Sequence, residues 1–429
     1  MSIKKILYFF YFSTLKKTAI ISLKINSPFI FFLVFILQIY KRKEIQNSKN
    51  IKKLFVFSKT GGNDDIIASL RGRTPKKKII FSHRIFFRLA HNYFINKDVN
   101  VSKVVKTEKI LEKKKYKKFI ENFLNYIKSY FGEVEFVTFN FNYHELFMLQ
   151  YLCNKKKINF SICLKECIKS DKQFDAEYSH IKNLYNNLNY ITKISTYNDL
   201  SKKYLLKYKL FKANKIKVTG FSRIPDIKNK KKASTLTVTF FMIDFQLLEE
   251  TLKSSSLKHK EKPVIKNMIK TINRDTIKIF FLLAKNNPNI NFNIKGKTGN
   301  WKQKQDIEKM SKFNHLNNIN FYFGGTGHNL ILNSSIIIGF NSTTIFEAMC
   351  LNKNVVVPYF KKFRVNKIKS YIFKYPRAVL ANDKNDLYKK LNFIISGNAI
   401  DQRKNLNIIN YYLGDFKNAK KNLRNFLSL

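Results

Sequence analysis

The chain has 429 residues, 45% of them hydrophobic, with only 13 glycines and 7 prolines, which excludes a disordered, collagen-like or linker-dominated protein and indicates two or three packed domains. Its formal net charge of +53 indicates an anionic partner such as nucleic acid, a lipid headgroup or a phosphorylated substrate. The charge does not choose among these classes, because the enrichment in Lys, Asn, Ile and Phe runs through the whole chain, as an AT-rich genome would produce.

Residues 1–46 alternate apolar stretches with basic ones. The longest apolar run, Phe29 to Tyr40, is shorter than the roughly 20 residues of a membrane-spanning helix, and it ends in the basic cluster Lys41–Lys43. No small-residue cleavage site follows it, which disfavours a secretory signal. We expect either an ordinary core helix or an interfacial helix that holds a cytoplasmic protein at the inner, anionic face of the membrane.

From residue 51 short apolar, β-rich runs alternate with amphipathic stretches, a pattern typical of α/β domains. Residues 47–213 are predicted to form a first Rossmann-like domain, with a helical stretch from Lys106 to Tyr130. Its candidate strands are Lys53 to Phe57, Lys78 to Phe81, Val134 to Phe139, Ile158 to Ile162 and Tyr190 to Ser195. Because helices separate the strands, the sheet is predicted to be parallel and covered on both faces.

A second α/β series is predicted for residues 214–395, after which residues 396–429 form closing helices. A basic linker, Lys228 to Lys232, comes early in this part of the chain. The candidate strands are Thr235 to Phe241, Asn289 to Ile294, Asn318 to Phe323, Ser335 to Gly339 and Asn354 to Pro358. Helices are expected at Asp275 to Lys285, Thr344 to Leu351, Asp383 to Phe393 and Lys417 to Phe426.

The segment Ser334 to Phe360 carries the clearest chemical signal, since it reads as strand, tight loop, helix and strand. In a parallel sheet such a loop lies at the carboxyl edge, where ligands bind and where the following helix exposes its amide donors. Hydroxyls and amides that can bind an anion are therefore expected at Asn341, Ser342, Thr343 and Thr344. Glu347, one turn further on, can accept hydrogen bonds from the hydroxyls of a ribose. An alternative is that Thr344 and Glu347 are only a helix-initiating capping box.

Other strand ends supply further candidates for the same site. Lys295 and Lys297 follow the strand NFNI, where an ammonium can meet a diphosphate, although each is also compatible with a solvated cation. His328 closes the run GGTGH, which lacks the GxGxxG spacing of a dinucleotide fingerprint. Side chains that bind a phosphate together with side chains that bind a ribose indicate a nucleotide-binding site.

The strand–GFNSTTIFEA–VVVP arrangement of residues 338–358 resembles the nucleotide-sugar half of GT-B glycosyltransferases of bacterial surface-polysaccharide biosynthesis. Residues 216–226 (IKVTGFSRIPD) are similar to the crossing between the two halves of these enzymes, although Ile224 and Pro225 make it less regular. The segments ICLKECIK and Tyr197–Asp199 are similar to motifs of the acceptor half. The resemblance covers about residues 51 to 400 and implies two Rossmann-like domains that face each other across a cleft.

The implied activity is transfer of a sugar from a nucleotide-sugar donor to a cell-surface polysaccharide, lipid-linked or lipopolysaccharide acceptor. Such a transfer needs a general base for the acceptor hydroxyl and cations or amides for the departing phosphate. For the base we prefer Glu166, and Asp64 is the second candidate. Glu166 is also compatible with a surface ion pair, and the loop of Asp64 is also compatible with a plain turn. No DxD motif is present beyond the adjacent Asp64 and Asp65, so a metal-independent enzyme without cofactor is expected.

Three alternatives stay open. A nucleotide-sugar 2-epimerase shares the architecture but acts on the donor itself. A nucleic-acid-binding protein would use the high charge, but the 70 lysines against 11 arginines and the lack of any zinc finger, RRM or basic-zipper motif make nucleic acid an unlikely partner. The third is an inactive polysaccharide-binding protein of the same fold. The four cysteines are too few and too scattered for a disulfide framework or a zinc site.

Overall fold

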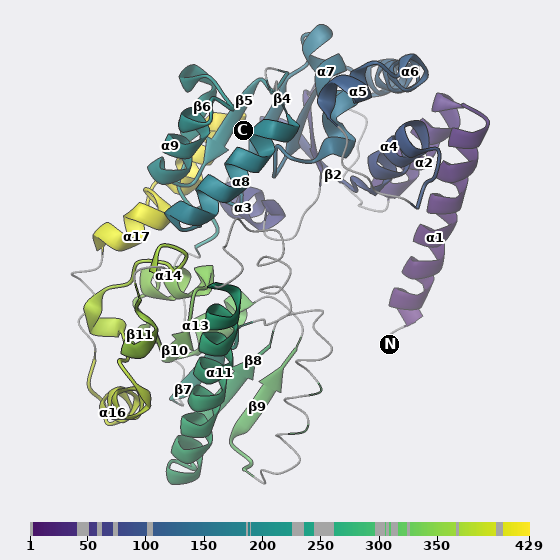
Figure 1. Cartoon of the computed structure of the whole chain (residues 1–429). Helices are drawn as coiled ribbons and strands as arrows, with labels where there is room; N and C mark the ends of the chain where they lie inside the picture. The colour runs from purple at the N-terminus through teal and green to yellow at the C-terminus, as the bar shows by residue number, and fades with distance from the viewer. Residues whose placement is uncertain are drawn as a thin grey trace. The chain divides into compact units, whose positions relative to one another are not determined.

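The computed structural model describes residues 3–40, 51–57, 62–71, 76–100, 106–185, 188, 190–224, 236–243, 261–296, 305, 309, 316–323, 327–365, 369–399 and 406–429. The chain divides into two compact units (Figure 1). Unit 1 comprises Met1–Cys167, Tyr178–Arg223 and Gly414–Leu429. Unit 2 comprises Ile168–Glu177 and Ile224–Leu413. The C-terminal residues therefore return to the first unit.

Unit 1 is built on a six-stranded parallel sheet with the order β2-β1-β3-β4-β5-β6. Its strands are β1 (Lys53–Phe57), β2 (Lys78–Ser82), β3 (Val134–Thr138), β4 (Phe160–Cys163), β5 (Lys193–Thr196) and β6 (Ile216–Val218). The adjacent inner strands β1, β3 and β4 are buried along their whole length. Apolar runs without alternation are what a parallel sheet covered on both faces requires.

Helices cover this sheet. They are α3 (Gly62–Leu70), α4 (Ile85–Asn96), α5 (Thr107–Leu111), α6 (Lys114–Phe131), the 3₁₀ turn η1 (His144–Leu146), α7 (Phe147–Lys155), α8 (Asp171–Leu184), α9 (Asp199–Lys207), η2 (Ala213–Lys215) and α18 (Ala419–Leu427). The helix α6 buries seven side chains along one face, including Phe119, Ile120 and Phe123. Its periodicity, apolar at every third or fourth residue, is that of a helix packed on a sheet.

The chain begins with a helical hairpin, α1 (Ile3–Lys24) and α2 (Pro28–Tyr40). The turn places Asn26 in the left-handed region, at φ 51°, and Pro28 opens the second helix, where its missing N–H is not needed. Phe31 and Phe35 of α2 pack edge-to-face on Phe123 of α6. Among the described helices, none combines the length and apolarity needed to cross a bilayer.

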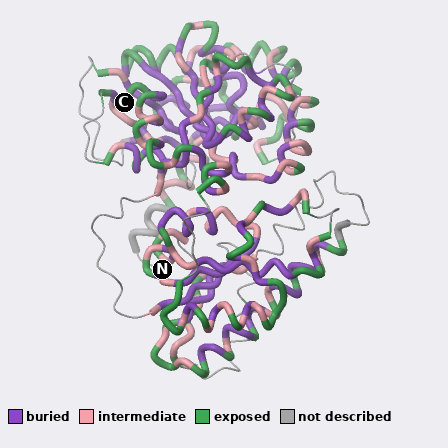
Figure 2. The backbone as a smooth tube through the Cα atoms, turned by 90° about the vertical axis from the view of Figure 1, so that its left-hand side faces the viewer, coloured by how far each residue is buried: buried purple, intermediate pink, exposed green. Residues whose placement is uncertain are grey.

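Unit 2 contains a five-stranded parallel sheet with the order β11-β10-β7-β8-β9. Its strands are β7 (Thr237–Phe241), β8 (Asn291–Lys295), β9 (Ile319–Tyr322), β10 (Ile336–Gly339) and β11 (Asn354–Val356). Its helical elements are α11 (Glu261–Asn286), α13 (Gly327–Asn333), α14 (Thr343–Cys350), η4 (Lys361–Phe363), η5 (Arg377–Val379), α16 (Lys384–Ile395) and α17 (Leu406–Leu413). Figure 2 shows long buried stretches within the tube where the strands run.

The predicted α/β fold with two parallel sheets is confirmed, and all ten predicted strands are present. Two local predictions need correction. The single helix expected from Lys106 to Tyr130 is broken at Glu112 and Lys113, so it forms α5 and α6. The segment Ile216–Val218, interpreted only as a crossing, pairs in parallel with β5 and is the edge strand β6.

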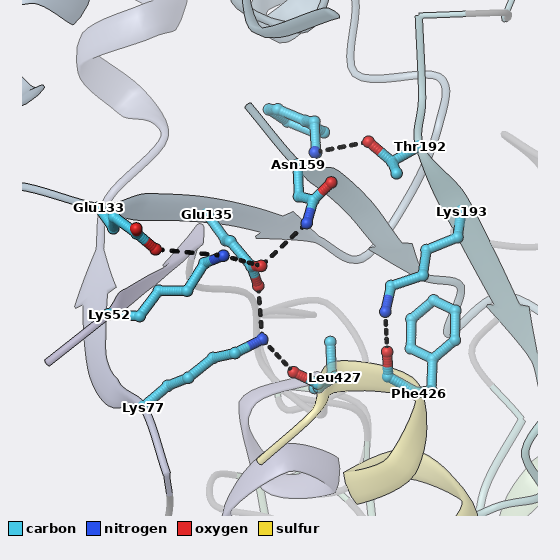
Figure 3. Close-up of polar contacts among 10 residues, drawn as sticks. Lys52, Lys77, Glu133, Glu135, Asn159, Thr192, Lys193, Phe426 and Leu427 are labelled. Carbon is cyan, nitrogen blue, oxygen red and sulfur yellow. Dashed lines mark hydrogen bonds and ion pairs between the residues drawn. The ribbon is translucent and has the colours of Figure 1, made fainter. Parts of the chain in front are cut away.

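Polar contacts fasten the C-terminal helix α18 to the amino ends of the unit 1 strands (Figure 3). The Lys77 Nζ donates to the Leu427 carbonyl at 2.6 Å and to the Glu135 carboxylate at 2.7 Å, and Lys193 donates to the Phe426 carbonyl. These lysines satisfy carbonyls that the end of a helix leaves unpaired, and their charge complements the helix dipole.

The carboxylate of Glu135 is the acidic centre of this group. Burial raises its pKa, but hydrogen bonds from Lys77, Asn159 and Lys52 outweigh burial and hold the pKa below its ordinary value. Burial has the opposite effect on a cation, and it lowers the pKa of Lys193. The C-terminal residues thus belong to unit 1 through a buried charge network as well as through apolar contacts of Leu423 and Phe426.

Candidate functional site

The strand register of unit 2 brings the predicted donor-site residues to one edge of the sheet. Gly339 lies beside Phe241, Phe241 beside Lys295, and Lys295 beside Tyr322. These four residues end β10, β7, β8 and β9, so the loops that follow the four strands start from one row. We call this row and its loops the donor edge.

The loop after β10 is tight. A Cβ at Gly339 would lie 2.8 Å from Ile345 Cδ1, so a larger residue would require the end of the Ile345 side chain to shift. Asn341 has φ 48°, a left-handed conformation that asparagine tolerates better than most residues. Ser342 is the N-cap of α14, its Oγ accepting from the Thr344 amide at 3.4 Å. The capping-box interpretation of Thr344 and Glu347 is therefore wrong, because the helix begins at Thr343 and its N-cap is Ser342, two residues before Thr344.

Glu347 and His328 are brought together from separate segments. The His328 Nδ1 lies 3.8 Å from the Glu347 Oε2, and their side chains are 28% and 13% exposed. Gly327 permits this approach, since a Cβ there would lie 2.9 Å from the Phe241 ring. Both side chains are partly exposed, so a ligand can reach the imidazole at the start of α13 and the carboxylate in α14.

Lys295 is buried at 6% exposure, and its Nζ donates to the carbonyl of Gly296. Burial lowers the pKa of its amine. The other predicted cation, Lys297, lies outside the described residues, as do Trp301 and the first three residues of the run GGTGH.

A cluster of aromatic side chains that the sequence analysis did not identify packs against α14 and the loop before it. The Phe373 amide donates to Asn341 Oδ1 at 3.0 Å, which fixes the left-handed loop residue. Phe346 of α14 stacks on Tyr412 with centroids 4.4 Å apart and on Tyr375 at 5.7 Å. Burial raises the pKa of the Tyr412 phenol, which accepts a hydrogen bond from the Lys374 amide. The spacing of aromatics in FKYP, residues 373–376, is the only local signal for this support.

In unit 1, Glu166 follows β4 at the carboxyl edge of the sheet. The Lys165 amide donates to the Phe139 carbonyl at 3.2 Å, and Asn198 Nδ2 donates to the Cys167 carbonyl at 2.9 Å. The second of these bonds joins the two segments that resemble acceptor-half motifs. The Glu166 side chain is 41% exposed and lies 3.8 Å from the Lys165 Nζ, so its carboxylate is both reachable and charge-paired.

The two neighbouring aspartates of α3 differ sharply. Asp64 is exposed, whereas Asp65 is 3% exposed and accepts from the Tyr197 hydroxyl at 2.5 Å and the Ser222 hydroxyl at 3.2 Å. The Arg223 Nε lies 3.6 Å from the same carboxylate. Asp226, the other charged residue of the segment 216–226, lies outside the described residues. Burial raises the pKa of the Tyr197 phenol well above its ordinary value.

A third polar group follows β2 and β3 at the same sheet edge. Arg84 forms an ion pair with the buried Glu145, and the His144 Nδ1 lies 3.8 Å from the other Glu145 oxygen. Burial lowers the pKa of His144 despite the Glu145 charge. His144 and Glu145 belong to the segment FNYHE, residues 141–145, and no sequence motif there predicted a site.

All four cysteines lie among the described residues, where they are buried and unbridged. Burial raises the pKa of the Cys163 thiol to about 12, so it is unreactive at neutral pH. Among the residues that the structure describes, no three His, Cys, Asp or Glu side chains gather as metal ligands would. Metal independence stays a prediction.

No protein-family model and no curated protein matches the sequence. Solved structures do match. The UDP-GlcNAc 2-epimerase of Methanocaldococcus jannaschii has a TM-score of 0.50 at 11% identity, over 88% of this chain and 99% of that one. The UDP-GlcNAc 2-epimerase of Neisseria meningitidis bound to UDP-GlcNAc has a TM-score of 0.45 at 14% identity, over 88% and 100%. The pneumococcal O-GlcNAc transferase GtfA has a TM-score of 0.43 at 9% identity, over 72% and 59%.

The match to the M. jannaschii enzyme, together with the two parallel sheets, confirms the predicted fold class, an α/β protein of GT-B type with two Rossmann-like domains. The neighbours are epimerases and glycosyltransferases, all at low sequence identity.

Proposed function

We propose that the protein is a glycosyltransferase that moves a sugar from a nucleotide-sugar donor to a cell-surface polysaccharide, lipid-linked or lipopolysaccharide acceptor. One observation carries the proposal: sheet register brings an amide-rich helix start, a carboxylate, an imidazole and a buried ammonium, each predicted separately, to the donor edge of unit 2. The M. jannaschii neighbour is named for a nucleotide sugar, UDP-GlcNAc, which is consistent with this chemistry.

The donor edge offers groups that can bind the phosphates and the ribose of a nucleotide diphosphate. The N-terminus of α14, with the Ser342 and Thr343 amides and the Ser342, Thr343 and Thr344 hydroxyls, suits a phosphate because amides at a helix start and the helix dipole both favour an anion. Glu347 accepts from the ribose hydroxyls, and His328 holds its carboxylate in place. Lys295 and Lys297 neutralise charge that develops on the departing diphosphate.

The acceptor hydroxyl loses its proton to Glu166 as its oxygen attacks the anomeric carbon and the bond to the diphosphate breaks. Glu166 suits this role because its carboxylate is 41% exposed at a strand end, with Lys165 beside it to stabilise its charge. Asp64 is the second candidate, since its side chain is exposed at the start of α3. Asp65 is not a candidate, because its oxygens already accept hydrogen bonds from Tyr197 and Ser222.

A thermal-stability screen against UDP-, GDP-, CMP- and dTDP-linked sugars tests donor binding, since a ligand that binds only the folded protein raises its melting temperature. We expect one nucleotide class to stabilise the protein and the others not to. With that donor and an acceptor, Glu166→Gln should abolish transfer and leave donor affinity unchanged. Near-normal turnover of this variant would remove Glu166 from the role of base.

A nucleotide-sugar 2-epimerase is the second candidate, favoured by the likeness to the M. jannaschii enzyme over nearly all of that chain. The two functions differ in their need for an acceptor. Incubation with the stabilising nucleotide sugar alone, followed by NMR of the sugar C2 proton, separates them: a transferase leaves the sugar configuration unchanged, whereas an epimerase inverts it.

A further inference from the structure

The outer face of the N-terminal hairpin is apolar although it is exposed. On α2, Phe29, Leu33 and Leu37 are 48%, 41% and 48% exposed. Their spacing of four residues places them in one stripe, while Phe31 and Phe35 face the core. A helix that is apolar on its solvent side as well as its core side is unusual for a surface element and marks an interaction face.

The stripe extends onto neighbouring elements. Ile25 in the turn and Ile21 near the end of α1 are 58% and 54% exposed. On α6, Tyr126 and Tyr130 are 36% and 40% exposed, and both rings contact Phe32 of α2. Tyrosine, with an apolar ring and a polar hydroxyl, is enriched where proteins meet the headgroup layer of a membrane. We call these side chains, from α1, the turn, α2 and α6, the hairpin face.

The charge of the hairpin fits an anionic surface. Residues 1–43 contain eight Lys or Arg and no Asp or Glu, and Lys17 and Lys24 are exposed on α1. Helix α2 has 13 residues and therefore spans about 20 Å, shorter than the roughly 30 Å of a bilayer core. A helix of this length is too short to cross a bilayer, but it can lie along the membrane surface.

We propose that the hairpin face docks on an anionic lipid bilayer, with Phe29, Leu33, Leu37 and Ile25 inserted among the acyl-chain ends and Lys17 and Lys24 at the phosphates. Nucleic acid does not explain the face, because aliphatic side chains gain nothing from a phosphate backbone. The proposal does not depend on the enzymatic assignment and adds a partner to it.

The test is co-sedimentation of the full chain with phosphatidylcholine vesicles and with vesicles that also contain phosphatidylglycerol, at low and high salt. Because the net charge of +53 gives nonspecific adsorption, the decisive variant keeps the charge: Leu33→Asn with Leu37→Asn. Both side chains are exposed, so the fold is retained. The matched control is Leu282→Asn, which is 47% exposed on α11 of unit 2.

We expect binding only to the anionic vesicles, reduced by salt, and a fall in the partition coefficient of about tenfold or more in the double variant, from the apolar area it loses. The Leu282→Asn variant should bind like the wild type. Equal binding to neutral vesicles, an unchanged partition coefficient in the double variant, or an equal loss in the control would each overturn the proposal. Melting temperatures of all three proteins verify that they are folded.

Discussion

The two aspartates of α3 offer a sharp test of how unit 1 is held together. Asp65 is buried and accepts hydrogen bonds from Tyr197 at 2.5 Å and Ser222 at 3.2 Å, with Arg223 3.6 Å away. Replacing Asp65 by alanine leaves the buried Tyr197 hydroxyl without this acceptor. Removing one partner from a buried charged group destabilises a protein by about 3–5 kcal/mol. Arg223 is 24% exposed and can be hydrated, so we place Asp65→Ala at about 4 kcal/mol.

The control is the next residue, since Asp64 is exposed and its substitution by alanine should change stability by less than about 0.5 kcal/mol. Calorimetry resolves the effect because the units can melt separately. For a unit of about 230 residues, 1 kcal/mol corresponds to about 2–4 °C. Asp65→Ala should therefore lower the melting temperature of unit 1 by roughly 8–16 °C. Equal shifts for Asp64→Ala and Asp65→Ala would refute the buried network.

Three further predictions concern other parts of the molecule. Glu135→Gln should lower the free energy of unfolding by about 3 kcal/mol at neutral pH. Because the folded-state pKa of Glu135 is lowered, its ionised carboxylate stabilises the protein above its unfolded pKa, and this stabilisation is lost as the pH falls through the folded-state pKa. Denaturation curves of wild type and variant should therefore converge below about pH 4. Gly414→Ala should cost more than about 3 kcal/mol by thermal unfolding, because its Cβ would lie 1.9 Å from the Tyr197 carbonyl, whereas Gly397→Ala, also at positive φ but with nothing within 4 Å, should cost only about 1 kcal/mol. Lys295→Met should weaken donor binding about tenfold, measured by titration calorimetry. Because the pKa of Lys295 is lowered, the wild type should lose donor affinity as rising pH deprotonates this amine below the ordinary lysine pKa. The Lys295→Met variant should not show this pH dependence.

The strands were predictable because each is a short run rich in apolar residues, and the inner strands such as β1, β3 and β10 are buried along their whole length. The donor-edge residues were predictable for a related reason: all follow strands, and strand ends of a parallel sheet share an edge. The pairing of His328 with Glu347 was not, because it depends on how α13 and α14 pack, and their sequences lie 19 positions apart without a common pattern.

The choice between Asp64 and Asp65 could not be made from sequence, since adjacent helix residues point in different directions and only packing tells which one is buried. The return of residues 414–429 to unit 1 was equally hidden. It rests on contacts such as Lys77 with the Leu427 carbonyl, 350 residues apart, for which no local signal exists. Sequence patterns therefore report elements and edges, whereas partners across the fold require coordinates.

The central claim is that the donor edge binds a nucleotide sugar through Glu347. Calorimetric titration of the stabilising nucleotide sugar into the wild type and into Glu347→Ala measures this directly. The control is Asp386→Ala, since this carboxylate of the same unit pairs with Lys390 within α16 and is not one of the proposed donor ligands. We predict a loss of affinity of about tenfold or more for Glu347→Ala, as expected when hydrogen bonds to a charged group are removed, and none for Asp386→Ala. Unchanged affinity in the Glu347→Ala protein would contradict the assignment of this edge to the donor.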